Sequence, residues 1–177
     1  MKKLHLLCSK DELRPSMNHV KVTKEYCIAT DAHILAAVPT ELMFDPEFID
    51  KIPEQGILIH HEDWKKMTTG INVVWKSEDV IRVLVKNKRD ILIEVESEDE
   101  MGKYPDWRAV CPSEDMREEL PAIGINAKIA ATLQDALGYT SLALSFSGAS
   151  RAISVTSVNR GEREGVIAVL MPVMIDN

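Results

Sequence analysis

The order of strands and helices repeats along this chain, and this repeat is the feature that most constrains the fold. The first copy is a strand, a helix ending at a glycine, and three strands, at residues 56–60, 62–70, 71–76, 80–86 and 90–96. The second copy has the same order at residues 122–126, 127–137, 142–146, 152–156 and 165–173. Two β-α-β-β-β units about 66 residues apart predict an α+β fold with antiparallel sheets and two short helices.

The length of 177 residues is enough for one sizeable domain with a real core. We expect a single domain in three parts. Residues 1–55 are an N-terminal strand extension and connection, with extended segments at 20–23, 26–29 and 34–38. Residues 56–112 are the first unit plus a linker, and residues 113–177 are the second unit.

Charge and cysteine content restrict the function classes. The net charge of -7 argues against a protein that coats nucleic acid with its whole surface, although a local basic face is compatible with it. The three cysteines, Cys8, Cys27 and Cys111, are widely spaced and odd in number, as expected for reduced thiols. No apolar run has the length of a membrane span or the pattern of a signal peptide, so we expect a cytoplasmic location.

A polar turn interrupts two apolar strands between Tyr26 and Thr40. Its Asp31 and His33 are potential metal ligands, but no third or fourth ligand follows at a recognisable spacing. His60 and His61 lie at a strand end, where alternation places the two rings on opposite faces. Because no further ligands accompany it, Asp31 suits a tight turn in which its carboxylate accepts backbone N–H groups. We expect no catalytic residue, no metal site and no cofactor, and hence no enzyme.

Three short stretches carry a resemblance to a known family. "RPSMNHV" followed by "ATDAHILA" resembles the "RPxLNGV … ATDGHRLA" segment of the bacterial DNA polymerase III β subunit, the β sliding clamp. "YPDWRAVCP" resembles the "FPDYRRVLP" segment of that family, and "AVLMPV" resembles its closing "YVVMPM". The three stretches occur in family order. The resemblance implies a DNA clamp fold, in which two β-α-β-β-β units make one domain. It also implies that this chain has counterparts of only the later halves of two clamp domains.

The resemblance also implies a cleft for partner proteins, because these stretches line the family's apolar cleft for short linear motifs. Carried over by position, the lining is Met17, Thr30, Ala32, His33, Leu35, Pro105, Val110, Val169, Met171, Pro172 and Val173. Such a set gives adaptable apolar walls with a few polar groups. Ile34 and Ala109 replace two family arginines, and Ala32 replaces a glycine. The alternative is that these residues only fill a core.

Clamps slide on DNA because basic residues on their inner helices meet phosphate groups. The corresponding residues here are Lys65, Lys66 and Lys128. Neighbouring carboxylates leave both helices close to neutral, so we expect weak DNA contact. The only tight basic cluster, residues 86–89, suits a solvated hairpin turn.

The resemblance therefore predicts a non-enzymatic protein of DNA replication or repair that docks partners carrying a clamp-binding motif. Binding of double-stranded DNA and a processivity role through self-association are left open. The alternative is a stand-alone interaction module of phage or mobile-element type, which recruits or diverts clamp-binding proteins without encircling DNA. A clamp fold with an unrelated ligand is a third reading.

Overall fold

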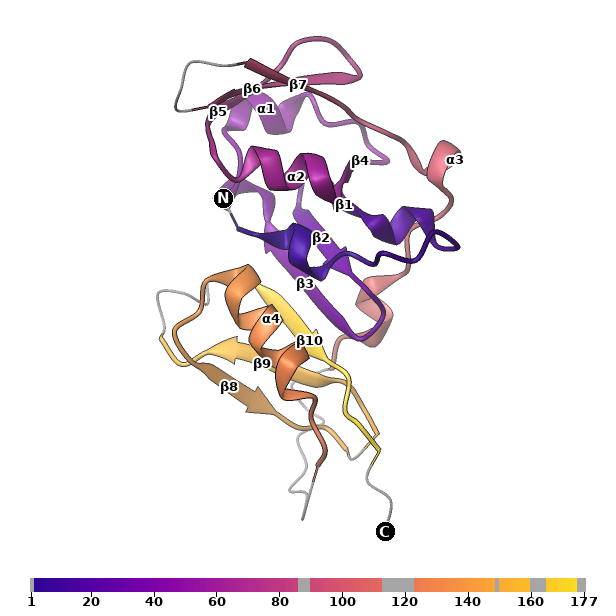
Figure 1. Ribbon diagram of the computed structural model, residues 1–177, viewed down its shortest axis with the longest axis vertical. Coiled ribbons are helices and arrows are strands. Elements are labelled where there is room, and N and C mark those ends of the chain that lie inside the picture. Colours follow the sequence, from indigo (N-terminus) through magenta and orange to yellow (C-terminus); the bar gives the residue numbers. More distant parts are fainter. Residues whose placement is uncertain (1, 86–89, 113–122, 149, 160–164, 175–177) are drawn as a thin grey trace.

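A computed structural model describes residues 2–85, 90–112, 123–148, 150–159 and 165–174 of the chain. The molecule is elongated, with an N-terminal lobe made by residues 2–112 and a C-terminal lobe made by residues 123–174 (Figure 1). One seven-stranded antiparallel sheet, in the order β4-β1-β2-β3-β10-β9-β8, runs through both lobes. A separate three-stranded sheet, β5-β6-β7, belongs to the N-terminal lobe.

Both units expected from the sequence are present in the described residues. The first consists of β4 (Ile57–His60), α2 (His61–Met67), β5 (Gly70–Trp75), β6 (Val80–Val85) and β7 (Asp90–Glu94). The second consists of α4 (Ala127–Leu137), β8 (Leu142–Ser145), β9 (Ile153–Ser157) and β10 (Ile167–Leu170). The strand expected at 122–126 is reduced to one bridge at Gly124, and Ala122 lies outside the described residues.

A third set of the same elements precedes these two, where the sequence suggested only a strand extension. It consists of the 3₁₀-helix η1 (Leu4–Leu7), followed by β1 (His19–Val22), β2 (Tyr26–Thr30) and β3 (Ile34–Pro39). The remaining elements are short and connect the units: η2 (Pro15–Asn18), η3 (Thr40–Leu42), α1 (Pro46–Asp50), α3 (Glu98–Met101) and η4 (Trp107–Val110).

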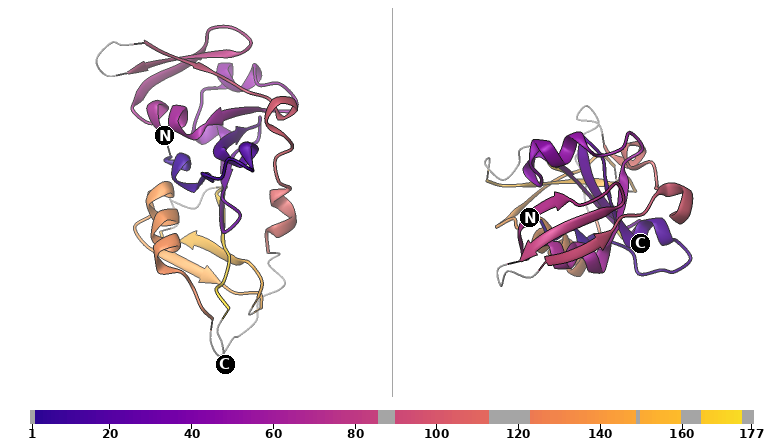
Figure 2. Two further views of the ribbon diagram at one scale, coloured as in Figure 1. Left: turned by 45° about the vertical axis from the view of Figure 1, so that its right-hand side comes forward. Right: turned by 90° about the horizontal axis from the view of Figure 1, so that it is seen from above.

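The two faces of the long sheet have different covers, because successive side chains of a strand point to opposite sides. On β3, Ile34 belongs to the larger apolar cluster, together with Leu4 of η1, Trp64 of α2 and Leu133 of α4. η1, α2 and α4 therefore lie on one side of the molecule, as Figure 2 shows for α2 and α4. The next residue of β3, Leu35, belongs to a smaller cluster on the other face, which the segment after α3 covers.

The two lobes are joined by β-sheet pairing and by helix packing. β3 and β10 pair antiparallel, from Ile34 opposite Leu170 to Ala37 opposite Ile167. On the helical side, the N–H of Lys3 donates to the carbonyl oxygen of Ala136 in α4 (2.8 Å). The lobes therefore share one sheet and one core.

The prediction that His60 and His61 point to opposite faces is wrong. Their ring centroids lie 4.3 Å apart. The alternation rule fails because α2 begins at His61, so the chain leaves the extended conformation between the two residues. In the part of the chain that the structure describes, no helix is long and apolar enough to cross a membrane.

Candidate functional site

The turn between β2 and β3 has the structure expected from its sequence. Asp31 Oδ1 accepts the N–H groups of His33 (2.8 Å) and Ile34 (2.9 Å), which confirms Asp31 as a turn residue. The hydroxyl of Thr30 donates to the carbonyl oxygen of Ile34 (2.8 Å) and accepts the N–H of Ala32 (3.1 Å). Ala32 has a φ of 75°, and it is the only described residue other than glycine with a positive φ. We call residues 30–34 the knuckle.

The C-terminal segment lies directly beside the knuckle. Leu35 of β3 is opposite Val169 of β10, and both side chains are buried. Beyond the end of β10, the N–H of Met171 donates to the carbonyl oxygen of His33 (2.9 Å). This bond places residues 171–173, which we call the tail, against the outer side of the knuckle.

The third predicted segment crosses the same face of the sheet, and two anchors hold it there. At its start, Glu98 Oε1 accepts a hydrogen bond from Lys21 Nζ (2.6 Å) and one from the N–H of Tyr104 (3.0 Å). Burial acts to raise the pKa of Glu98, but these two hydrogen bonds and the positive charges of Lys21 and Lys103 together lower it. Further along, the buried Tyr104 hydroxyl donates to the carbonyl oxygen of Ile28 in β2 (3.2 Å).

The helix η4 then fixes the segment over β2 and β3. Trp107 is buried in the same apolar cluster as Leu35 and Val169, and its ring meets Tyr26 edge-on at 5.4 Å. The Arg108 guanidinium lies 4.5 Å from the Trp107 ring centroid and pairs with Glu25 (2.8 Å). The tail therefore meets the knuckle at one end of β3, whereas η4 covers the Leu35 face of the sheet near Tyr26, at the end of β2 away from the knuckle.

By burial, the predicted cleft residues form two groups, which we call the floor and the rim. The floor consists of Met17, Thr30, Leu35 and Val169, all buried. The rim consists of Ala32, His33, Pro105, Val110, Met171 and Val173, which are exposed, and Pro172, which is half-buried. Ile34, which stands where the clamps have an arginine, is buried in the larger apolar cluster. Of the four floor residues, Leu35 and Val169 share one apolar cluster with Trp107.

A groove of about 580 Å³ opens beside the knuckle, between the N-terminal segment and α4. It contains Met17 and His33 from the predicted set. Its other lining residues are Leu6, Cys8, Ser9, Lys10, Asp11, Arg14, Asp31, Ile34, Ile129 and Thr132. Burial raises the pKa of the Cys8 thiol well above its usual range, so this group stays a neutral apolar part of the wall. Lysine, arginine and aspartate on the rim make the groove's edge charged but mixed in sign.

Most of these groove residues were missed by sequence reasoning, although Arg14 stands in the quoted stretch "RPSMNHV". Ile129 and Thr132 are surface positions of an amphipathic helix, and nothing local distinguishes them from other such positions. They reach the groove only because α4 packs against η1 across the lobe boundary, where Leu4 and Leu133 are buried in one cluster.

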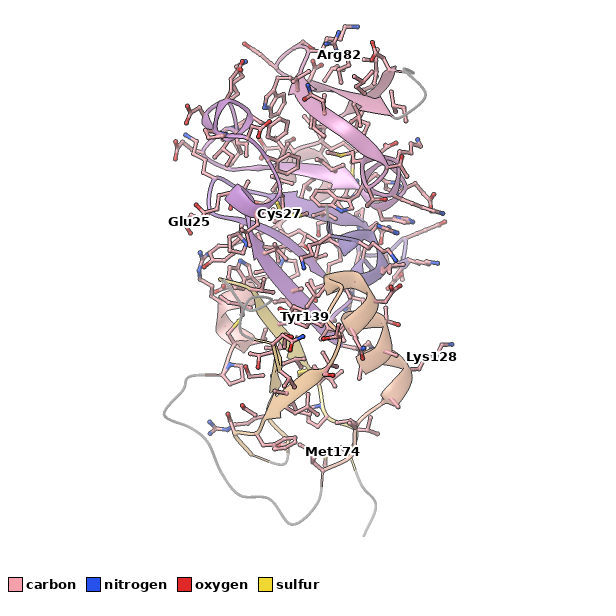
Figure 3. All side chains as sticks on the ribbon, turned by 90° about the vertical axis from the view of Figure 1, so that its left-hand side faces the viewer. Glu25, Cys27, Arg82, Lys128, Tyr139 and Met174 are labelled. Atoms are coloured by element: carbon pink, nitrogen blue, oxygen red, sulfur yellow. The ribbon has the colours of Figure 1, made fainter. Side chains whose placement is uncertain are left out.

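The three lysines expected to contact DNA differ in their surroundings. Lys66 Nζ lies 2.6 Å from Asp63 and Lys65 Nζ lies 3.9 Å from Glu62, so both are paired on α2. Lys128 has no ion pair among the described residues, and it extends away from α4 (Figure 3). The basic cluster at 86–89 lies outside the described residues.

Comparison with solved structures identifies the architecture. The β sliding clamp of Caulobacter crescentus superposes with a TM-score of 0.69 at 16% identity, covering 99% of this chain and 64% of that one. The chain has the fold of a bacterial β sliding clamp. The sliding clamp of Bartonella birtlesii matches with a TM-score of 0.62 at 19% identity, covering 98% of this chain and 64% of that one. The DNA polymerase III β chain of Streptococcus pneumoniae matches with a TM-score of 0.65 at 13% identity, with coverages of 99% and 64%.

The resemblance seen in three short stretches therefore extends to the clamp fold of nearly the whole chain. This chain spans about 64% of the length of the clamps that it matches. The C. crescentus clamp carries polyethylene glycol in a region described as tethering the β-motif, and the B. birtlesii clamp is bound to griselimycin. No protein-family model and no curated protein matches the chain.

Proposed function

We propose that this clamp-fold protein is a non-enzymatic docking protein that binds a short linear motif of partner proteins at the lobe junction. The observation that carries the proposal is the contact of the tail with the knuckle beside a groove of about 580 Å³, with η4 on the opposite face of the same sheet. Such a volume accommodates a few peptide side chains, and pockets of this size commonly hold ligands. The solved clamps of the same fold include one with griselimycin and one with polyethylene glycol at a β-motif region, which supports a docking role for this junction.

The chemistry of the site favours an apolar motif. Met171, Val173 and Val110 offer exposed apolar contacts on the rim, and Met17, Leu6 and Ile129 line the groove. Methionine adapts its shape to different partners at little cost. With Ile34 and Ala109 where the clamps have arginine, the site has less positive charge to pair with a carboxylate of the motif. We therefore expect it to prefer aliphatic and aromatic anchors over acidic ones.

A peptide titration tests the docking proposal. A fluorescently labelled clamp-binding peptide is titrated against the wild-type chain and against Met171→Asp, which places a charge at the centre of the proposed contact. Leu92→Asp is the matched control, because Leu92 is exposed on β7 at the far end of the N-terminal lobe. We expect Met171→Asp to weaken binding at least about tenfold, as a buried charge without a partner does, and Leu92→Asp to have no effect. Equal binding by wild type and Met171→Asp would remove the proposal.

DNA contact is the second candidate function, and one observation favours it. α2, η1 and α4 share one side of the molecule, which gives a single helical face, and Lys128 on that face has no ion pair among the described residues. The pairing of Lys65 and Lys66 with carboxylates weakens the case, because a paired lysine contributes less to phosphate binding. We therefore propose the docking of partner proteins, without encirclement of DNA, as the main function, and DNA contact as the second candidate. Binding to duplex DNA at low salt that is lost in Lys128→Ala would reverse this order.

A further inference from the structure

The described residues form three copies of one unit, a helix followed by three antiparallel strands. They are η1 with β1–β3, α2 with β5–β7, and α4 with β8–β10. In the second and third units, a leading segment enters the helix directly. β4 ends at His60 and α2 begins at His61, and residues 123–126 run into α4 at Ala127. β4 of the second unit covers the edge of β1 in the first unit, whereas the outer edge of β5 has no strand partner among the described residues.

Both edges of β4, the leading strand of the second unit, are used. One edge of β4 pairs with β1 of the first unit, from His19 opposite His60 to Val22 opposite Ile57. The other edge bridges to its own unit just beyond β7: the N–H of Leu58 donates to Glu96 (2.8 Å), and the N–H of Glu96 donates back (2.9 Å). A leading segment therefore links its own unit to the neighbouring one.

The third unit has the bridge from its leading segment to its own last strand, but among the described residues this segment lacks the pairing with a neighbouring unit. Gly124, like Leu58, is the third residue before its helix, and it makes the equivalent antiparallel bridge with Val173, just beyond β10 (2.8 Å). Its other edge has no partner among the described residues. The outer edge of β8, which corresponds to the edge of β1 that β4 covers, is also without a described partner.

The burial of side chains agrees with an incomplete third unit. Three of the four residues of β1 are buried, whereas all four residues of β8 are only half-buried. Large apolar side chains are also exposed on the leading segment and on the residues after β10 that run along its paired edge. Ile125 is 41% exposed, Val173 is 49% exposed, and Met174 is 76% exposed at the far end of the C-terminal lobe (Figure 3). An open strand edge and an apolar surface therefore occur together.

We propose that the third units of two copies of this chain pair reciprocally, so that residues 123–126 of each copy add as an antiparallel strand to β8 of the other. The register follows from the β1–β4 pair: Asn126 opposite Leu142, and Ile125 opposite Ala143. The two pairings are related by a twofold axis, so the interface closes at a dimer. The dimer contains six of the described units, and β8 of each copy gains the kind of neighbouring strand that β1 has within one chain.

The sequence of the two edges makes a second copy the best occupant. Neither residues 123–126 nor β8 contains a charged residue or proline, although open strand edges are usually protected by lysine, proline or a bulge. β7 is the contrasting case: twofold antiparallel pairing centred on Leu92 would place Asp90 opposite Glu94 of the other copy. Self-association is therefore favoured at β8 and disfavoured at β7.

Sedimentation velocity over a wide concentration range tests the proposal on the full chain. We expect the wild type to be a dimer that dissociates on dilution. Ala143→Lys puts a charge on the open edge, on the sheet face away from Leu142 and Leu144, which pack on the core. It should weaken dimerisation at least about tenfold, as should Ile125→Asp. The matched controls, Ala131→Lys on the exposed face of α4 and Leu92→Asp on β7, should leave it unchanged.

Hydrogen exchange adds a test that needs no variant. Amide exchange in β8 should slow as the concentration of the wild type rises, while exchange in β7 stays the same. A wild type that stays monomeric at all concentrations overturns the proposal, and so does concentration-dependent protection that maps to β7 instead of β8. Peptide titration separates this proposal from the docking function, because Ala143→Lys should bind the labelled peptide as the wild type does. Met171→Asp should lose the peptide and still dimerise.

Discussion

Ala32 holds a backbone conformation that glycine adopts more easily, and replacing it should stabilise the protein. Its φ of 75° lies in the left-handed region, which costs a residue with a Cβ about 1–2 kcal/mol. The hydrogen bonds of the knuckle come from Thr30, Asp31 and the backbone, so Ala32→Gly keeps all of them. The substitution therefore isolates the cost of the backbone conformation.

The expected gain is the left-handed cost minus the entropy that glycine adds to the unfolded chain. The second term is about 0.4–1 kcal/mol, so Ala32→Gly should raise the free energy of unfolding by about 0.5–1 kcal/mol. The same exchange has the opposite sign in a helix. Ala131 is exposed on α4, where glycine should lower the free energy of unfolding by about 1 kcal/mol. The two variants should differ by about 1.5–2 kcal/mol.

Urea denaturation of the two variants and the wild type measures this difference, with equal slopes in denaturant as the condition for comparing midpoints. Ala131→Gly is the internal control, because it has the same change of side chain and the same effect on the unfolded state. If Ala32→Gly lowers stability as much as Ala131→Gly does, the left-handed conformation of the knuckle is not a source of strain, and the reasoning fails.

Three further outcomes follow from the structure. Gly56 has a φ of +79°, and a Cβ there would lie 2.7 Å from the carbonyl oxygen of Val22, so Gly56→Ala should lower the unfolding free energy by about 1–3 kcal/mol in urea denaturation. Burial lowers the pKa of both His5 and His60 below 6.5, so their neutral forms stabilise the fold fully above pH 6.5. This stability should be lost as the pH falls from 6.5 through the lowered pKa values, and a His5→Asn/His60→Asn variant should lose less between about pH 7.5 and about pH 5.5. Lys66→Ala removes an exposed ion pair and should shift the thermal midpoint by the equivalent of less than about 1 kcal/mol.

Sequence reasoning predicted elements best where local signals mark both ends. The helix expected at 127–137 has these bounds in the structure. Asn126 caps its start by accepting the N–H groups of Lys128 and Ile129, and Gly138 ends it with a φ of 68°. Except for the strand expected at 122–126, the strands of the two expected units also lie where alternation predicted them, within a few residues. In each case the deciding physics acts over a few neighbouring residues.

The first unit was overlooked because its helix is too short to leave a periodic pattern. η1 is one 3₁₀ turn of four residues, Leu4–Leu7, and an apolar period needs several turns to be visible. Without a helix signal, the strands after it resembled an extension. Their role follows from long-range pairing, since β1 pairs with β4 and β3 pairs with β10.

The same distinction between local signals and long-range contacts applies to the candidate cleft. The knuckle, η4 and the tail each have a local sequence pattern, so the resemblance in sequence is enough to indicate Thr30, Val110 and Met171. The groove beside the knuckle depends on where α4 lies, and that depends on the pairing of β3 with β10 and on the burial of Leu133 against η1. Those contacts join residues more than a hundred positions apart, and no local pattern records them. The proposed docking site therefore depends on the junction between the lobes, and a substitution that weakens the β3–β10 pairing should impair it even where every residue of the predicted cleft is intact.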